Sequence, residues 1–146
     1  MKACAYYKII PHLKLVIEYF GGNLTIDDVI NTKKQEIKDN YDPSFNFIVD
    51  FRNARNVFGE RELMEYITFV SRHKEFVGTR KSAIISNSAL SLVTTSIYAM
   101  YGRRSLPMDI KIVQNLSEAM HWTNVEKDNH DSINEILSGF KGTCLD

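Results

Sequence analysis

Short apolar runs alternate along this chain with segments of helical periodicity, and this alternation constrains the fold more than any other feature. Runs rich in β-branched and aromatic residues predict five strands, at 6–10, 13–20, 45–51, 81–86 and 108–114. Helical periodicity separates or follows the later strands, at 26–38, 60–76, 89–102 and 117–122. Strands joined by crossover helices form a parallel sheet, so the alternation predicts an α/β protein.

The first two strands differ from the rest because only a Pro11-His12 turn separates them. So short a connection predicts an antiparallel hairpin, and the predicted fold is a mainly parallel, mixed five-stranded sheet with an N-terminal antiparallel hairpin strand. We expect the helices to pack mostly on one face, because the apolar residues concentrate at alternate positions such as Phe45, Phe47 and Phe51. The polar strand residues are expected together on the poorer face: Lys14, Glu18, Asn46, Asp50 and Lys111.

Helix ends carry their own signals. Thr25 precedes acidic residues and then lysines, which predicts a capped helix over 26–38. Gly78 is expected to close the helix over 60–76. A weaker helical pattern at 132–140 precedes an end that we expect to fray.

Length and charge limit the classes of protein. A chain of 146 residues suits one domain, predicted as 1–146 with a core at about 6–123 and a helical tail at about 124–146. Its 18 Lys and Arg residues balance 18 Asp and Glu residues, which argues against a nucleic-acid partner. No apolar run approaches the roughly 20 residues of a membrane span, and the N-terminus lacks a signal-peptide pattern. We therefore expect a cytoplasmic location without an integral membrane segment, and Cys4 and Cys144 as reduced thiols.

Several segments together resemble a known family. They are GGNLTIDDVINTKKQEI, FNFIVDFRNARNV, RKSAIISNSALSLVTTSIYAMYG and MDIKIVQNLSEAMHW. In order and spacing, residues 6–122 resemble the SpoIIAA-like branch of the STAS fold, which is shared by sulfate transporters and anti-sigma-factor antagonists. The resemblance implies a stand-alone, non-enzymatic regulatory or protein-binding module. The uneven faces expected for the sheet and the absence of catalytic motifs suggest that it associates with a protein partner or with itself as a dimer.

The resemblance also implies where a phosphorylation switch would lie. Phosphorylated antagonists carry an Asp-Ser-Ser-Gly-like turn at the start of the helix that follows the central strand. The corresponding region here is NVFGERELM, and no Ser or Thr lies between Asn53 and Ile67. The chain is therefore predicted to lack the usual phosphorylatable residue.

Charged residues gather where the central strand ends, the usual place for ligand crevices in open α/β sheets. Asp50, Arg52 and Arg55 are candidates for holding an anion or a partner's charged side chain. The structural alternative is that Asp50 pairs with a neighbouring Arg or caps the loop.

The next strand ends in Ser86, Asn87 and Ser88, which are candidates for binding phosphate or carboxylate at a helix start. The alternative is an ordinary N-cap. No nucleotide-binding motif, metal-ligand spacing or G-x-S-x-G elbow accompanies these residues, so we expect no cofactor, no metal and no enzymatic activity.

Aromatic residues are dense near the predicted helices, which suggests an alternative function. An apolar cleft near the sheet, lined by Phe58, Tyr66, Phe69 and Tyr98, would bind a small apolar ligand or lipid.

Overall fold

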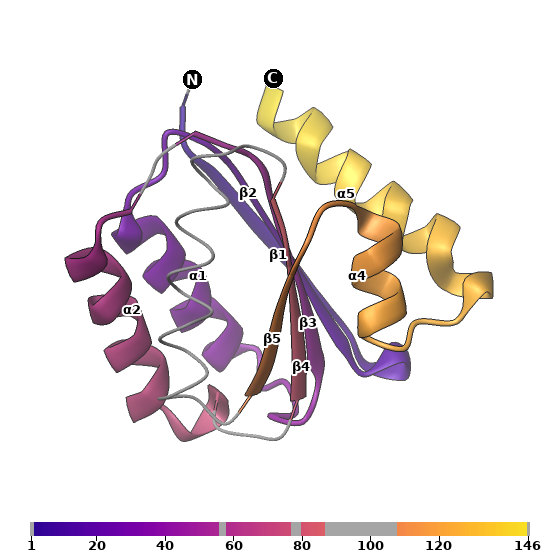
Figure 1. The fold of residues 1–146 in the computed structure, drawn as a ribbon, viewed down its shortest axis with the longest axis horizontal. Coiled ribbons are helices and arrows are strands. Elements are labelled where there is room, and N and C mark those ends of the chain that lie inside the picture. The colour runs from indigo at the N-terminus through magenta and orange to yellow at the C-terminus, as the bar shows by residue number, and fades with distance from the viewer. Residues whose placement is uncertain (1, 56–57, 77–79, 87–107, 146) are drawn as a thin grey trace.

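A mixed five-stranded sheet lies at the centre of the molecule (Figure 1), in a computed structural model that describes residues 2–55, 58–76, 80–86 and 108–145. Its strands are β1 (Cys4–Ile10), β2 (Leu15–Gly22), β3 (Asn46–Ala54), β4 (Arg80–Ile85) and β5 (Met108–Val113). They lie in the order β1-β2-β3-β4-β5, with β1 and β2 antiparallel and the remaining pairs parallel. The predicted fold class is confirmed.

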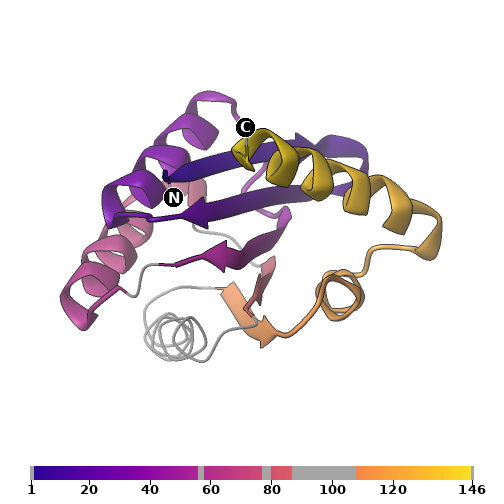
Figure 2. The same cartoon turned by 90° about the horizontal axis from the view of Figure 1, so that it is seen from above.

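The described helices lie on both sides of this sheet (Figure 2). On one side are α1 (Ile26–Lys38) and α2 (Glu60–Arg72), and on the other are α4 (Leu116–Trp122) and α5 (His130–Leu145). Short 3-10 turns occupy Pro11–Leu13, Lys74–Phe76 and Lys127–Asn129. The predicted helix at 89–102 and the predicted stop at Gly78 lie outside the described residues.

Both faces of the sheet bury a hydrophobic cluster, so the prediction of one poorer, half-polar face is wrong. The α1 and α2 side holds Val16, Phe20, Phe47 and Val49, and the α4 and α5 side holds Ile17 and Ile48, among others. The reason is the register of β2 and β3, which pairs Val16 with Phe47 and Ile17 with Ile48. Even positions of β2 therefore share a face with odd positions of β3.

This register separates polar residues that the sequence pattern had grouped together. Glu18 pairs with Val49 in the sheet and lies on the α1 side. Asn46 lies on the α4 side, where its Nδ2 donates to the Thr123 carbonyl at 3.1 Å. Each face thus receives a few polar groups within an apolar layer.

The predicted bounds of α1 are confirmed by the structure of its cap. Thr25 Oγ1 accepts a hydrogen bond from the Asp28 amide at 3.3 Å, and Asp28 Oδ2 accepts one from the Thr25 amide at 2.8 Å. This reciprocal pair is a capping box, which satisfies two amides at the start of the helix.

The predicted helix over 60–76 ends early, at Arg72. The His73 amide donates to the Val70 carbonyl at 3.2 Å, and a 3-10 turn follows at Lys74–Phe76. Phe76 is fully buried in the cluster on the α1 side. Tight burial of this ring accompanies the change from α-helix to 3-10 turn.

The prediction that the C-terminal segment frays is wrong, because α5 packs on the sheet. Ile133 and Leu137 are buried against it, and the rings of Tyr6 and Phe140 stack with centroids 5.5 Å apart. Cys4 and Cys144 form a disulfide that joins β1 to α5, so the prediction of reduced thiols is wrong. Both ends of the chain lie at the same end of the molecule (Figure 1).

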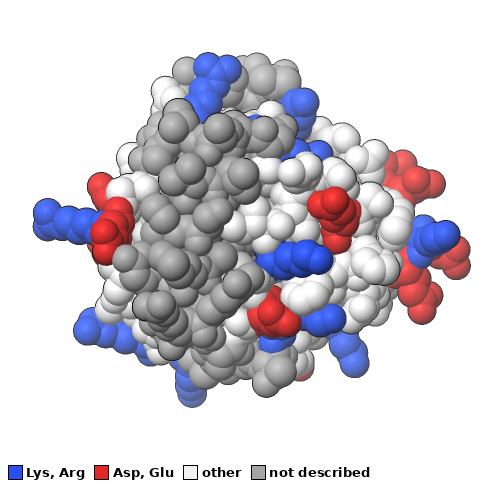
Figure 3. Space-filling view, viewed as in Figure 1, with Lys and Arg blue, Asp and Glu red and all other residues white. Residues whose placement is uncertain are grey.

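Within the described residues, no helix is both long and apolar enough to cross a bilayer. On the described part of the face in Figure 3, acidic and basic side chains are interspersed. This distribution does not form a basic patch of the kind that binds a polyanion.

Candidate functional site: a cavity beside buried charges

A cavity lies between the sheet and the two helices α1 and α2. Its free space is about 50 Å³, and one water needs roughly 10–15 Å³ in the same measure, so it can hold a few waters or a small ligand. Most of its lining is apolar and comes from all described elements on this side, including Val29 of α1, Val70 of α2 and Ile84 of β4. The charged groups in the lining are Glu18, Lys33 and Arg80.

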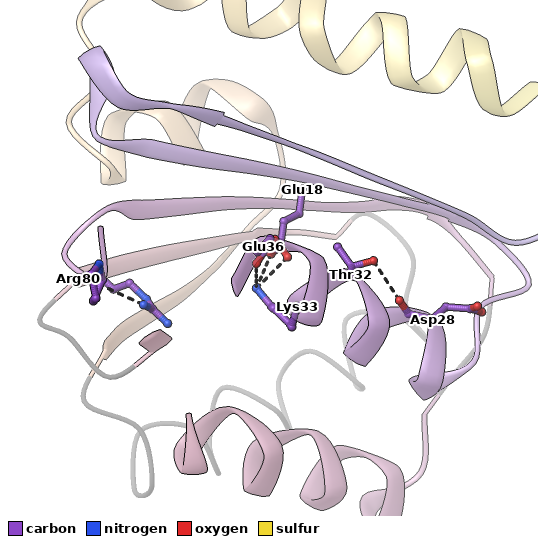
Figure 4. A network of polar contacts seen from close by, with 7 residues as sticks. Glu18, Asp28, Thr32, Lys33, Glu36 and Arg80 are labelled. Carbon is purple, nitrogen blue, oxygen red and sulfur yellow. Dashed lines mark hydrogen bonds and ion pairs between the residues drawn. The ribbon is translucent and has the colours of Figure 1, made fainter. Parts of the chain in front are cut away.

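Glu18, Lys33 and Glu36 form what we call the buried charge cluster (Figure 4). Lys33 Nζ lies 2.7 Å from Glu18 Oε2 and 3.5 Å from Glu36 Oε2. The three residues are at most 5 % exposed. Lys33 and Glu36 are three residues apart on the sheet-facing side of α1, and β2 presents Glu18 opposite them.

Burial and the neighbouring charges set the protonation of this cluster. Burial raises the pKa of Glu36 well above its ordinary value, and repulsion from Glu18 raises it further, although Lys33 opposes both effects. Both Glu36 oxygens lack a hydrogen-bond partner of ordinary geometry, and Lys33 Nζ lies closer to Glu18 than to Glu36. Geometry and electrostatics therefore both favour a neutral Glu36.

Lys33 keeps its charge in spite of being buried. Burial alone would lower the pKa of the ammonium, but the Glu18 and Glu36 carboxyl groups outweigh this effect and raise it. Lys33 Nζ also lies 4.3 Å from the centroid of the Phe47 ring. The cluster thus contains one ammonium matched by one carboxylate and a neutral acid.

Arg80 is a second buried cation at the start of β4, and it is only 5 % exposed. Its Nη1 donates to the Pro43 carbonyl at 3.2 Å, and its Cζ lies 4.7 Å from the Phe47 centroid and 6.0 Å from the Phe76 centroid. Its Nε is buried without a hydrogen-bond partner. These contacts fix the guanidinium plane but leave part of its donor capacity unused.

Tyr41 lies close to the same charges. Its ring packs edge-on against Phe47, with centroids 5.6 Å apart, and its hydroxyl has no hydrogen-bond partner. Burial raises the pKa of the Tyr41 phenol, although the Lys33 and Arg80 cations act to lower it. The phenol therefore stays neutral at physiological pH and can act as a donor.

The predicted site at the end of β3 lies on the opposite side of the sheet. Arg52 donates from Nε and Nη2 to the two carboxylate oxygens of Asp50, at 2.9 Å and 2.8 Å. This hydrogen bonding raises the pKa of Arg52, although partial burial opposes it. Asp50 is buried and engaged by its neighbour, as the structural alternative predicts, while Arg55 is exposed.

The remaining predicted residues are only partly brought together. Phe58 and Tyr66 line the cavity, and Phe69 packs against the same hydrophobic cluster without lining it. Ser86 directly follows β4; its buried hydroxyl has no hydrogen-bond partner, and it does not line the cavity. Asn87, Ser88 and Tyr98 lie outside the described residues.

Sequence reasoning missed the three charged residues of the cavity, Glu18, Lys33 and Arg80. Lys33 carried a detectable signal, because it follows Val29 and Ile30 at helical spacing and so falls within the apolar stripe of α1. Glu18 likewise interrupts the apolar run of β2. A charged residue within an apolar stripe indicates a buried ion pair, since Lys and Glu are almost never fully buried unless paired.

No known family model matches this chain, and no curated protein sequence matches it. The resemblance to the STAS fold therefore stays a prediction. Among the described residues, no group of three or more His, Cys, Asp or Glu side chains is placed to hold a metal ion.

Proposed function

We propose that this chain binds a small, largely apolar molecule in the cavity between the sheet, α1 and α2. The observation that carries this proposal is the cavity itself, an apolar space with charged groups in its lining. Ligand sites in proteins commonly combine apolar walls with a few convergent polar groups.

Packing supports an occupant for this space. Protein interiors contain few voids larger than a water molecule, because side chains next to a void lose dispersion contacts. Here large buried side chains such as Phe47 and Phe76 surround the space without filling it. A ligand of a few heavy atoms would restore those contacts.

The structure does not test the other predicted functions. The protein-binding module, self-association and the absence of catalysis stay predictions, because no described feature favours a particular partner or reaction. The small-ligand alternative gains support because Phe58 and Tyr66, two of its four predicted lining residues, lie at the cavity.

Filling the cavity tests the proposal. Ala54 lines it at the end of β3, and Ala54→Leu would replace a methyl group with an isobutyl group that projects into the space. We expect gently purified wild-type protein to carry a small molecule detectable by native mass spectrometry, and the variant to lose it while remaining folded. Met64→Ala is the control, because Met64 is exposed on α2 and does not line the cavity.

The proposal fails if no molecule co-purifies and none of a panel of small apolar compounds raises the melting temperature of the wild-type protein. It also fails if Ala54→Leu retains the ligand of the wild-type protein unchanged.

A further inference from the structure

Arg80 has a buried charge with no carboxylate partner. Within the described residues, no Asp or Glu oxygen lies within ion-pair distance of its guanidinium, whereas Lys33 and Arg52 each have such a partner. An unpaired buried charge is costly, so such a group is normally balanced by an anion.

The rest of the chain supplies little to balance this charge. The segments 56–57, 77–79 and 87–107 contain no Asp or Glu. Outside the described residues, the sequence has Asp146 as its only acidic residue.

The neighbouring carboxyl groups are already engaged. Glu18 is bound by Lys33 through both of its oxygens, at 2.9 Å and 2.7 Å. Glu36 is neutral for the reasons given above, and its nearest cation is also Lys33. Among the described residues, no carboxylate oxygen therefore lies in ion-pair contact with the Arg80 guanidinium, and its buried Nε has no hydrogen-bond partner.

We propose that Arg80 forms a carboxylate-binding subsite at one end of the cavity, so that the ligand is a small monocarboxylic acid with an apolar body. This inference rests on the proposed function and names the chemical class of its ligand. The guanidinium is suited to the task, because Nη1 is held by Pro43 while Nε has no partner, and one edge of an arginine fork matches a planar carboxylate.

Charge and size select this class over other anions. A single negative charge neutralises Arg80, whereas a phosphate dianion would add a second negative charge near the Glu18 carboxylate. A cavity of about 50 Å³ is far below the roughly 300–1,000 Å³ of drug-sized ligand pockets, so its occupant is a small molecule and not a two-chain lipid.

Matched acids and alcohols test the inference on the wild-type protein. Benzoate and hexanoate would be compared with benzyl alcohol and hexanol by isothermal titration calorimetry at neutral pH. We expect each acid to bind roughly tenfold or more tightly than its alcohol, since hydrogen bonds to charged groups are stronger than those to neutral groups.

Variants identify the residue responsible. Arg80→Gln is expected to remove the preference for the acid while still binding the alcohol, and Arg80→Lys to keep part of the preference. Arg55→Gln, at an exposed arginine outside the cavity lining, is expected to behave as wild type. If Arg80→Gln fails to fold, the comparison of acid with alcohol on the wild-type protein still tests whether the cavity prefers a carboxylate.

The possible failures are distinguishable. If wild-type protein binds acids and alcohols equally, or if Arg80→Gln keeps the full preference, the carboxylate subsite is wrong and the proposed function stands. If it binds none of the four compounds and no other small apolar molecule, both are wrong.

Discussion

Glu36 is fully buried beside a second carboxyl group, and both effects raise its pKa in the folded protein. Ionising Glu36 would place a second negative charge against Glu18, because Lys33, the cation that both carboxyl groups contact, lies closer to Glu18. The folded protein therefore binds this proton more tightly than the unfolded chain does. Linkage then requires the free energy of unfolding to fall as pH rises from the ordinary carboxyl range toward the raised pKa of Glu36.

Glu36→Gln should remove this dependence on pH. The amide keeps the shape and a donor toward Glu18 but cannot ionise, so the variant is expected to gain stability over wild type as pH rises above the ordinary carboxyl pKa. One proton changes the free energy of unfolding by at most about 1.4 kcal/mol per pH unit. Lys33 contributes in a separate window, because its raised pKa matters only above the ordinary lysine value.

Urea unfolding across the acidic to mildly alkaline range would measure the effect of Glu36→Gln. The other titratable groups that interact with Glu36 are Glu18, Lys33, Tyr7 and Tyr41, and all of them are kept in the variant. Glu65→Gln, at an exposed position of α2, is the control. Identical pH slopes for Glu36→Gln and wild type would contradict a proton held at this site.

At the scale of elements, α1 is the helix that positions the buried charge cluster. Its capping box fixes the start of the helix, and Lys33 and Glu36 follow in the later turns. Thr25→Ala removes the side-chain acceptor for the Asp28 amide and should lower the free energy of unfolding by about 1 kcal/mol. Ser138→Ala on the exposed face of α5 should change it by less than about 0.5 kcal/mol. Chemical denaturation gives both values, and equal effects would mean that the cap contributes nothing.

The elements that were predictable from the sequence are those with local causes. The cap at Thr25 and the ends of α1 depend on neighbouring residues, as does the hairpin turn at Pro11, and all of these predictions are confirmed. The end of α2 was not predictable in this way, because it coincides with the burial of Phe76 against distant residues.

The residues of the candidate site come from different elements, and only the packing of these elements brings them together. Which face Glu18 occupies follows from the register of β2 against β3, and strand periodicity alone does not specify that register. The partnership of Glu18 with Lys33 requires in addition that α1 cross on that face. By contrast, Asp50 and Arg52 are two residues apart, and their pairing was among the alternatives that the sequence offered.

At the scale of the whole molecule, the first strand and the last helix hold the two ends of the chain together. Tyr6 stacks on Phe140 and Cys4 bonds to Cys144, so α5 is attached to β1 by packing and by a covalent bond. Disulfides are rare in reducing compartments, which weighs against the predicted cytoplasmic location. That location stays a prediction.

Reducing the disulfide should destabilise the whole fold and leave the cavity unchanged. The bond closes a sequence separation of 140 residues, and the chain-entropy model assigns about 4 to 5 kcal/mol to a loop of this order. Urea unfolding with and without dithiothreitol is expected to show a decrease of this size in the free energy of unfolding. The free energy of unfolding of the double variant Cys4→Ser, Cys144→Ser should not change when the reductant is added. Ligand binding by the folded fraction should persist, because α5 covers the face of the sheet opposite the cavity. Two titratable thiols in the denatured, unreduced protein would contradict the bond.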